Sequence, residues 1–368
     1  MSEPLTLLIG TYTEPIEFGT GQILESQGRG IYSYRFNPAD GEATFKDVTQ
    51  SVRNPSYLTL RKRRGRKVLY AVNETKNHQG GTSGAVSAFR LDTEGTLILL
   101  NQQPSFGADP CHLTTDPTGK FLLVANFTSG SVSVFPLEED GSLGDASDVV
   151  QHTGRGPHPI RQTGPHAHAV TFDPSGKFVY VPDLGLDRVM IYSLGTRGTL
   201  EPTSKPFVQV KPGAGPRQIV MHPKYLYAYL INELDSSLTV YERNENTGDL
   251  TEVQTLRTLP EHFEADNIGA EVQLSPSSEF LYASNRGHDS IALFRVSTGG
   301  DRLTLIGHES TRGRTPRHFT ISPQGDFILA ANQDSGTVVV FKREEATGRL
   351  EAVGQPLEVP TPVCVLFA

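Results

Sequence analysis

The sequence predicts an all-β protein folded as a seven-bladed β-propeller, and three observations carry this prediction. An outline of alternating apolar and polar runs, with a Pro turn and an Asn at fixed places, recurs about every fifty residues. Each copy holds four short alternating runs, which is typical of a propeller blade of four antiparallel strands. No apolar period typical of a helix lasts three turns, so we expect helix to be nearly absent.

Six copies of this outline follow one another along the chain. They begin near Pro55, Pro110, Ala167, Pro216, Gly269 and Pro316. The chain ends supply a seventh copy, because residues 5–12 resemble a second strand, 30–37 a third and 41–49 a fourth, whereas 361–368 resemble a first strand. We therefore predict a single domain over residues 1–368 with one blade shared between the N- and C-terminal strands, since this pairing closes the ring and removes exposed sheet edges.

Composition narrows the range of partners. The formal net charge of −8 over 368 residues predicts repulsion of phosphate backbones and anionic lipids, which argues against nucleic acid and membrane partners. No stretch is long and apolar enough to cross a membrane and no signal-peptide pattern is present, so we expect a cytoplasmic location. The basic run 61–67 falls where other copies place a turn and is expected to be solvated. Cys111 and Cys364 fit no metal or redox spacing and are expected to be buried.

Four loops depart from the repeat, and strand alternation places all four on one face. They comprise residues 13–29, 73–83, 151–165 and 257–269. Because loops on a rigid scaffold carry function, we expect the binding site on this face. His152, His158 and His166 belong to or adjoin the third loop, and we expect them at the surface, whereas His168 should face the central channel.

One column of the repeat is interpreted as structural. The residues at the ends of the second strands are Thr11, Asn73, Asn126, Asp183, Asn232, Asn285 and Asn332. We expect these side chains to hydrogen-bond their own turns as Asx-turns. Calcium is the alternative, but it requires several converging carboxylates and this column offers one, so no metal is expected.

Three other columns, one after the second strands and two neighbouring ones at the starts of the first strands, contain polar and charged residues. They contribute Glu74, His112, His168, Arg217, Glu233, Glu271, Arg286, Arg317, His318 and Gln333. Because first strands line a propeller channel, these side chains should meet at one mouth of it. One interpretation is a structural ring of ion pairs, with Glu233 paired to Arg217. Arg286 would then pair with Glu271. The excess of Arg over carboxylate favours an anionic ligand instead.

Three segments resemble the seven-bladed propeller lactonase family, which includes propeller-type 6-phosphogluconolactonase and 3-carboxy-cis,cis-muconate lactonizing enzyme. They are GPHAHAVTFDPSGKFVYVPDLGLDRV (164–189), GAGPRQIVMHP with YLINELDSSLTVYE (213–242) and GAEVQLSPSSEFLYASNR (269–286). The resemblance covers essentially the whole chain. In the lactonizing branch the active group has one His, two Arg and one Glu without a metal, and these map onto His168, Arg217, Glu233 and Arg286.

The resemblance implies a lactonase that hydrolyses a sugar-acid lactone without a cofactor, with anionic 6-phosphogluconolactone as the leading substrate. Glu233 would then activate water, His168 would be its acid/base partner, and Arg217 and Arg286 would contact the oxyanion and the carboxylate. Arg317 is the candidate phosphate contact. Further substrate contacts are expected from His112, Glu271, His318, Gln333 and Glu74.

Two alternatives remain open from the sequence. The same residues would suit the cycloisomerase that forms a lactone from 3-carboxy-cis,cis-muconate. A non-catalytic propeller that binds other proteins on its face is the alternative from another class, and the absence of Trp argues mildly against it.

Overall fold

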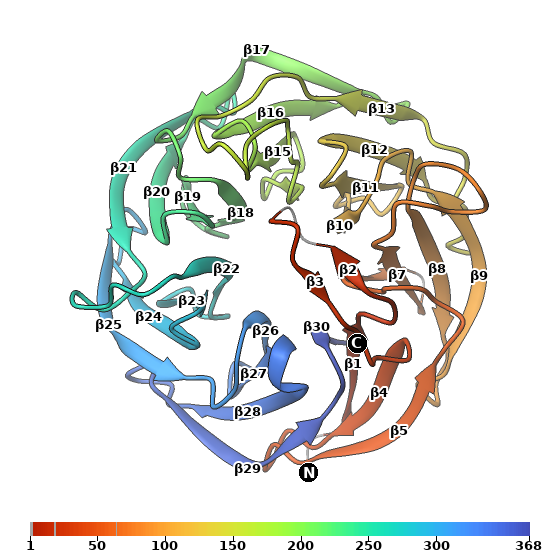
Figure 1. Ribbon diagram of the computed structural model, residues 1–368, viewed down its shortest axis with the longest axis vertical. Helices are drawn as coiled ribbons and strands as arrows, with labels where there is room; N and C mark the ends of the chain where they lie inside the picture. Colours follow the sequence, from red (N-terminus) through yellow and green to blue (C-terminus); the bar gives the residue numbers. More distant parts are fainter. Residues whose placement is uncertain (1–2, 18–19, 64) are drawn as a thin grey trace.

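Seven four-stranded antiparallel sheets surround a central channel in the computed structural model, which describes residues 3–17, 20–63 and 65–368 (Figure 1). The predicted seven-bladed propeller is therefore confirmed. Helix is limited, within those residues, to one 3-10 turn, η1 (Gln333–Ser335). The extended segments follow the alternating runs because burying every second side chain against the next blade requires a period of two.

Six blades are continuous in sequence, and their strands are given from the channel outward. The first three contain β6 (Leu58–Arg63), β7 (Arg66–Asn73), β8 (Ala85–Leu91) and β9 (Leu97–Pro104); β10 (Pro110–Thr115), β11 (Phe121–Asn126), β12 (Ser131–Pro136) and β13 (Asp148–Gln151); and β14 (Thr171–Phe172), β15 (Phe178–Asp183), β16 (Arg188–Leu194) and β17 (Leu200–Gln209). The next three contain β18 (Pro216–Met221), β19 (Tyr227–Asn232), β20 (Ser237–Arg243) and β21 (Leu250–Arg257); β22 (Ile268–Leu274), β23 (Phe280–Arg286), β24 (Ser290–Val296) and β25 (Leu303–Ser310); and β26 (Pro316–Ile321), β27 (Phe327–Asn332), β28 (Thr337–Arg343) and β29 (Leu350–Glu358).

The seventh blade joins the two ends of the chain. It contains β30 (Pro362–Phe367), β1 (Leu5–Thr11), β4 (Ile31–Phe36) and β5 (Ala43–Thr49). The antiparallel register pairs Leu8 with Leu366 and Gly10 with Cys364. Cys364 is 1% exposed, and Cys111 is also buried, which confirms the expectation for both thiols. The ring is thus closed by backbone hydrogen bonds between the first and last strands.

Neighbouring blades are joined by buried apolar clusters and by repeated tyrosine hydrogen bonds. A Tyr hydroxyl in the second strand donates to a glycine carbonyl in the third-to-fourth strand turn of the next blade. These pairs are Tyr70–Gly141 (2.9 Å), Tyr180–Gly248 (2.7 Å), Tyr229–Gly300 (2.7 Å) and Tyr282–Gly348 (2.8 Å). The hydroxyl group satisfies its hydrogen-bonding requirement while its ring remains in the core. Each blade therefore depends on its neighbour for both packing and polar contacts.

The asparagines that end the second strands donate hydrogen bonds through their side-chain amides and do not form Asx-turns. Asn232 Nδ2 donates to Ser237 Oγ (2.9 Å) on the far side of its own turn, whereas Asn285 and Asn332 donate to the carbonyl groups of Thr258 (2.9 Å) and Thr311 (2.9 Å), in the connections that lead into their blades. Asp183, by contrast, accepts hydrogen bonds from its own turn, from the N–H groups of Gly185 and Leu186. The column is structural, but the Asx-turn prediction is wrong for these asparagines. The Oδ1 atoms of Asn232 and Asn332 accept no hydrogen bond from the described residues, and Oδ1 of Asn285 accepts from Thr258 and Asn267.

The basic run 61–67 is only partly a solvated turn. It includes the end of β6 and the start of β7, and residue 64 lies outside the described residues. Lys62 and Arg66 are exposed, as expected. Arg61 is 5% exposed, and its Nη1 lies 3.4 Å from the Glu138 carbonyl of the next blade. The prediction is wrong for Arg61 because the neighbouring blade packs over this strand pair.

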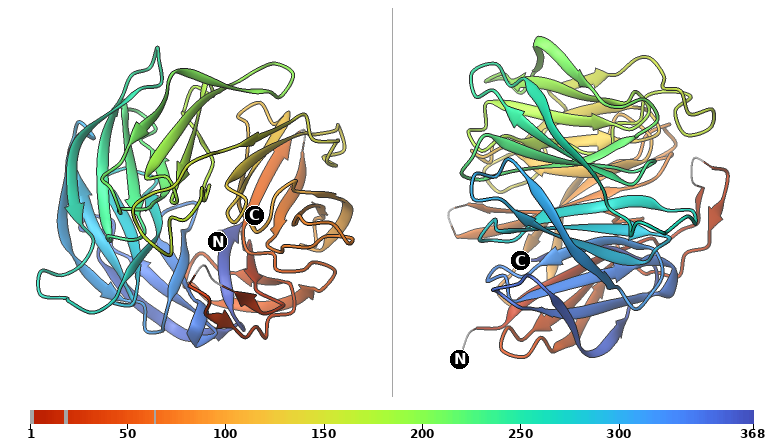
Figure 2. Two further views of the ribbon diagram at one scale, coloured as in Figure 1. Left: turned by 45° about the horizontal axis from the view of Figure 1, so that its top comes forward. Right: turned by 90° about the vertical axis from the view of Figure 1, so that its left-hand side faces the viewer.

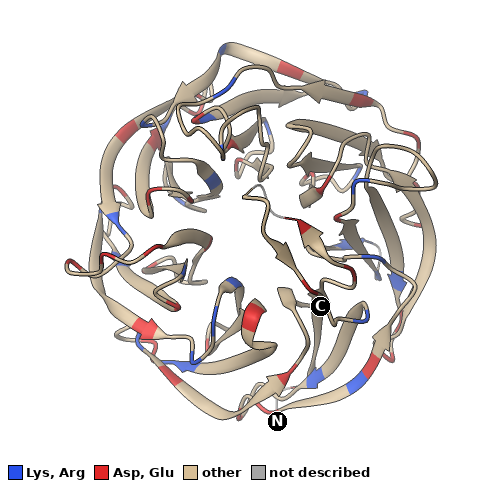
Figure 3. Cartoon of the chain, viewed as in Figure 1, with Lys and Arg blue, Asp and Glu red and all other residues tan. Residues whose placement is uncertain are grey.

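The four loops that depart from the repeat lie on one face, as predicted. A hairpin of β2 (Ile16–Glu17) and β3 (Ile23–Leu24) occupies loop 13–29 and projects over the channel, while the N-terminus lies toward the other side (Figures 1 and 2). The salt bridge between Glu17 and Lys76 (3.4 Å) joins the hairpin to loop 73–83. Residues of both charge signs are spread along the outer strands (Figure 3).

Ring closure can be tested by deleting residues 362–368. The deletion removes the innermost strand of the shared blade and leaves the edge of β1 unpaired, so we expect loss of the cooperative thermal transition. Circular dichroism against temperature measures this. A truncated protein with an unchanged Tm would contradict the pairing of β1 with β30.

Candidate active site

A β-bulge at the start of the first strands brings the polar columns together. Pro216 pairs with Asn232 and Gln218 with Ile231, so Arg217 is an extra residue without a partner in the ladder. The same shift leaves one extra residue in other blades, and the extra residues include Cys111, Arg317 and Val363. A bulge redirects a side chain from the sheet face, which explains why these positions gather at the channel.

His168 is held at the corresponding place by an irregular segment. The regular strand β14 begins only at Thr171, so the predicted strand around His168 is interrupted. An isolated bridge pairs Ala167 with Asp183, and the His168 N–H donates to the Pro182 carbonyl (3.0 Å). These backbone contacts fix the imidazole at the channel, where the sequence predicted it.

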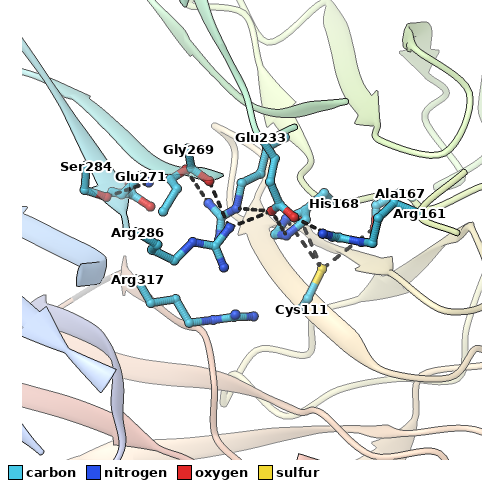
Figure 4. A network of polar contacts seen from close by, with 12 residues as sticks. Cys111, Arg161, Ala167, His168, Glu233, Gly269, Glu271, Ser284, Arg286 and Arg317 are labelled. Atoms are coloured by element: carbon cyan, nitrogen blue, oxygen red, sulfur yellow. Dashed lines mark hydrogen bonds and ion pairs between the residues drawn. The ribbon is translucent and has the colours of Figure 1, made fainter. Parts of the chain in front are cut away.

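The carboxylate of Glu233, directly after β19, is the centre of the polar network (Figure 4). Glu233 is 2% exposed. Its Oε2 lies 2.8 Å from Arg286 Nη2 and 3.2 Å from Arg217 Nε, and its Oε1 lies 2.5 Å from Arg161 Nη2. Burial alone raises the pKa of this carboxyl, but the charges of Arg286, Arg161, His168 and Arg217 outweigh burial and hold the pKa well below its usual range.

The arginine pairing differs from the structural ring considered from the sequence. Glu233 does contact Arg217, as expected. Arg286, however, binds Glu233 and the Gly269 carbonyl (2.9 Å), not Glu271. The pairing of Arg286 with Glu271 is wrong because the bulge in β22 turns Glu271 into the deeper channel.

His168 lies beside Glu233 in its neutral form. Its Nε2 is 3.9 Å from Glu233 Oε2, and its side chain is 10% exposed. Burial, followed by the charge of Arg217, lowers the pKa of this imidazole well below its usual value, although Glu233 opposes the shift. A neutral imidazole has a lone pair that can accept a proton, and the adjacent carboxylate would stabilise the resulting cation.

Arg317 forms a second cationic centre with its own acceptors. Its Nη2 is 3.9 Å from Glu74 Oε1, and its guanidinium carbon lies 5.6 Å from the ring centroid of Tyr12. Tyr12 in turn donates its hydroxyl to Glu74 (3.1 Å). Burial opposes the charge on Arg317, but Tyr12, Glu74 and Glu233 raise its pKa, so it remains cationic.

A pocket of about 320 Å³ opens above this network on the face that carries the loops. The hairpin, loop 151–165 and the end of loop 257–269 contribute walls through Ile16, Leu24, Arg161 and Ile268. Six predicted site residues line this pocket: Glu74, His168, Glu233, Arg286, Arg317 and Gln333. The structure therefore places most of the predicted group in one cavity.

Four predicted residues lie deeper, in a much smaller cavity that shares His168 and Arg317 with the pocket. They are His112, Arg217, Glu271 and His318. The two histidine rings contact Tyr57, with centroid distances of 4.2 Å for His112 and 5.6 Å for His318. Burial, with the charge of Arg217, lowers the pKa of both imidazoles to about 3. These residues support the floor of the pocket and do not form its wall.

The sequence did not identify Arg161, which the structure adds to the group. This residue lies in loop 151–165, where no other copy supplies an aligned position. The loop was predicted to belong to the binding face, and that signal indicates the segment but not the residue.

The histidines of this loop do not all lie at the surface. His152 is 3% exposed, with Nδ1 2.6 Å from Asp183 Oδ2 and Nε2 3.0 Å from the Tyr192 hydroxyl. The surface prediction is wrong for His152 because it anchors the loop to two blade residues. His158 and His166 are partly exposed, and the ring of His166 stacks on Phe127 at 4.6 Å.

The described residues were compared with the requirements of a metal site and of a membrane-spanning helix. Within residues 3–17, 20–63 and 65–368, no three or more His, Cys, Asp or Glu side chains are grouped so that they could hold a metal ion. The same residues form no helix with the length and hydropathy needed to cross a bilayer.

The deep residue Glu271 should make stability depend on pH. Burial raises the pKa of its carboxyl from 4.5 to about 7, against the opposing effects of Arg217, Gln273 and Gln218. The folded protein then holds this proton more tightly than the unfolded chain, so the stabilisation is complete below pH 4.5 and is lost as pH rises through about 7. We expect the Tm of the wild type to fall between pH 5 and 8 by a few degrees more than the Tm of Glu271→Gln.

The matched control is Glu264→Gln, which changes an exposed carboxylate on loop 257–269. Its Tm should follow the wild type at every pH. Parallel curves for Glu271→Gln and the wild type would contradict the assigned pKa.

Known proteins with related sequences and structures identify the family. Residues 6–367 match the family model described as Lactonase, 7-bladed beta-propeller. A 6-phosphogluconolactonase of Bacillus subtilis (strain 168) is 36% identical over 360 residues, which cover 98% of this chain and 97% of that protein. A Bacteroides fragilis protein of known structure is 37% identical with a TM-score of 0.89, covering 100% of this chain and 98% of its own. The structure of the periplasmic gluconolactonase of Pseudomonas aeruginosa is 32% identical with a TM-score of 0.89, covering 99% of each chain. This chain therefore belongs to the seven-bladed β-propeller lactonase family.

Proposed function

We propose that this protein is a lactonase that hydrolyses a sugar-acid lactone, with 6-phosphogluconolactone as its substrate. The observation that carries the proposal is the pocket in which neutral His168 lies beside Glu233 and several guanidinium groups. Lactone hydrolysis requires a proton acceptor for water and positive charge for the developing oxyanion, and this group supplies both. The names of the Bacillus and Pseudomonas relatives support the same reaction class.

We assign proton transfer to His168. Water attacks the lactone carbonyl carbon and gives its proton to Nε2, and the bond between that carbon and the ring oxygen then breaks. The ring oxygen takes the proton from the imidazolium, which releases the open hydroxy acid. Glu233, expected from the sequence to be the base, has its carboxylate oxygens within 3.2 Å of the guanidinium groups of Arg286, Arg217 and Arg161, so we do not assign proton transfer to it. Its charge instead stabilises the imidazolium.

The arginines on the pocket wall supply the positive charge that the oxyanion and an anionic substrate require. Arg286 and Arg317 can donate to the oxyanion or to an anionic group of the substrate, because both line the pocket. Arg217 lies below Glu233 and lines the deeper cavity, so we assign it to holding the carboxylate. The guanidinium groups that face the pocket favour a phosphorylated lactone over a neutral one. A phosphorylated sugar acid would place the activity in the cytoplasm.

Hydrolysis of 6-phosphogluconolactone, measured against spontaneous hydrolysis by acid release, tests this proposal. We expect acceleration that EDTA does not abolish. Loss of activity with EDTA and recovery with calcium or zinc would contradict the metal-independent mechanism. A rate equal to the spontaneous rate for both 6-phosphogluconolactone and gluconolactone would contradict the lactonase itself and favour a non-catalytic propeller.

Two substitutions separate the assigned roles. His168→Asn removes the proton acceptor and should lower kcat by about 10²–10⁴ with little change in Tm. Glu233→Gln leaves buried guanidinium groups uncompensated, so it should lower both kcat and Tm. Thermal unfolding and kcat should be measured on the same preparations. If Glu233→Gln lost kcat with an unchanged Tm and His168→Asn stayed active, Glu233 and not His168 would be the general base.

A further inference from the structure

Arg161 reaches the pocket from a different part of the fold than the other arginines. Arg217, Arg286 and Arg317 belong to the inner strands β18, β23 and β26. Arg161 lies in the long connection between β13 and β14, which runs over the β14–β17 blade (Figure 1) and lines the pocket. It therefore enters the pocket from its mouth, whereas the others rise from its floor and sides.

The turn that carries Arg161 is built as a rigid support. The N–H of Gly156 donates to the Gln162 carbonyl (3.1 Å), and the N–H of Gln162 donates to the His158 carbonyl (3.1 Å). The Gln162 side chain is fully buried, and its Nε2 donates to the Leu184 carbonyl (2.8 Å) of the β14 blade. His158 Nδ1 accepts a hydrogen bond from the backbone N–H of Arg161 (3.1 Å). Arg161 is thus presented by a fixed turn anchored to the propeller.

The guanidinium of Arg161 keeps hydrogen-bond donors available to the pocket. Its Nη2 binds Glu233, and its side chain is 15% exposed. Arg286 and Arg217 have a second acceptor in the protein, the carbonyl oxygens of Gly269 and Ala270. For Arg161, the part of the chain that the structure describes offers no hydrogen-bond acceptor to Nε or Nη1. These donors can bind a ligand without breaking the contact with Glu233.

The carboxylate that Arg161 contacts already has two other cationic partners. Glu233 already has Arg286 and Arg217 within 3.2 Å, and Arg317 has Glu74. The other carboxylates on the wall have partners of their own. These pairs are Glu17 with Lys76, Asp109 with Thr128 and Asp334 with Thr315. An anion that enters next to Arg161 can therefore bind this guanidinium while Glu233 keeps its contacts with Arg286 and Arg217.

We propose that Arg161 is a specificity-determining residue that binds the phosphate of a phosphorylated lactone at the mouth of the pocket. This inference rests on the proposed function. The lactone carbonyl lies below, at His168 and Arg286, and the phosphate at the far end of the sugar meets the donors of Arg161. A guanidinium suits this contact because its planar fork matches two phosphate oxygens. Glu233 holds the guanidinium of Arg161 in this position.

The kinetic test compares Arg161→Gln with Arg155→Gln on two substrates. Arg155 is exposed on the same loop, so the control removes the same charge away from the pocket. Arg161→Gln should lower kcat/KM for 6-phosphogluconolactone by about 10-fold or more relative to gluconolactone, mainly through KM. Arg155→Gln should leave the ratio between the substrates within about twofold of the wild-type ratio. An equal loss on both substrates would overturn the proposal, since Arg161 would then act only through Glu233.

The Kd values of 6-phosphogluconate and gluconate, measured by calorimetry, test the proposal independently of turnover. The wild type and Arg155→Gln should bind 6-phosphogluconate more tightly, and Arg161→Gln should lose that preference. A variant at Arg161 that keeps the wild-type preference, or a wild type without one, would overturn the proposal. If the wild type hydrolyses neither lactone but shows the preference, the lactonase assignment fails while the phosphate contact of Arg161 stands.

Discussion

The burial of one carboxylate determines how this site is built. Glu233 lies almost entirely out of water, and a buried charge is tolerated only when opposite charges and hydrogen bonds compensate it. Three guanidinium groups supply that compensation from three parts of the chain, Arg217, Arg286 and Arg161. The same carboxylate thus positions the cations to which we assign the binding of an anionic substrate, and it keeps a negative charge beside His168.

The propeller makes this convergence possible through a small repeated irregularity. One extra residue at the start of a first strand frees a side chain from the sheet, and in one blade that residue is Arg217. The closed ring then brings β18, β19 and β23 to one channel mouth, although β18 and β23 start more than sixty residues apart. Stability and chemistry are linked here, because opening the ring would separate groups that compensate one another.

The sequence could predict the site residues that lie on the repeated strands, but not the one that lies on a loop outside the repeat. Stacking the copies located His168, Glu233, Arg286 and Arg317, since each occupies a position with an equivalent in every blade. Arg161 has no equivalent, so its place in the pocket depends on a loop path that the repeat does not encode.

The sequence also could not predict which arginine pairs with which carboxylate at the channel mouth. Strand spacing placed Arg286 and Glu271 in one blade but could not show that the bulge in β22 separates them. Glu271 instead accepts hydrogen bonds from Gln218 and Gln273 in the deep channel.

The most direct test of the proposed site is a crystal structure of the protein with bound 6-phosphogluconate. We predict the C1 carboxylate within hydrogen-bonding distance of His168 and Arg286, above Glu233. Product bound in solution but located away from this pocket in the crystal would contradict the account.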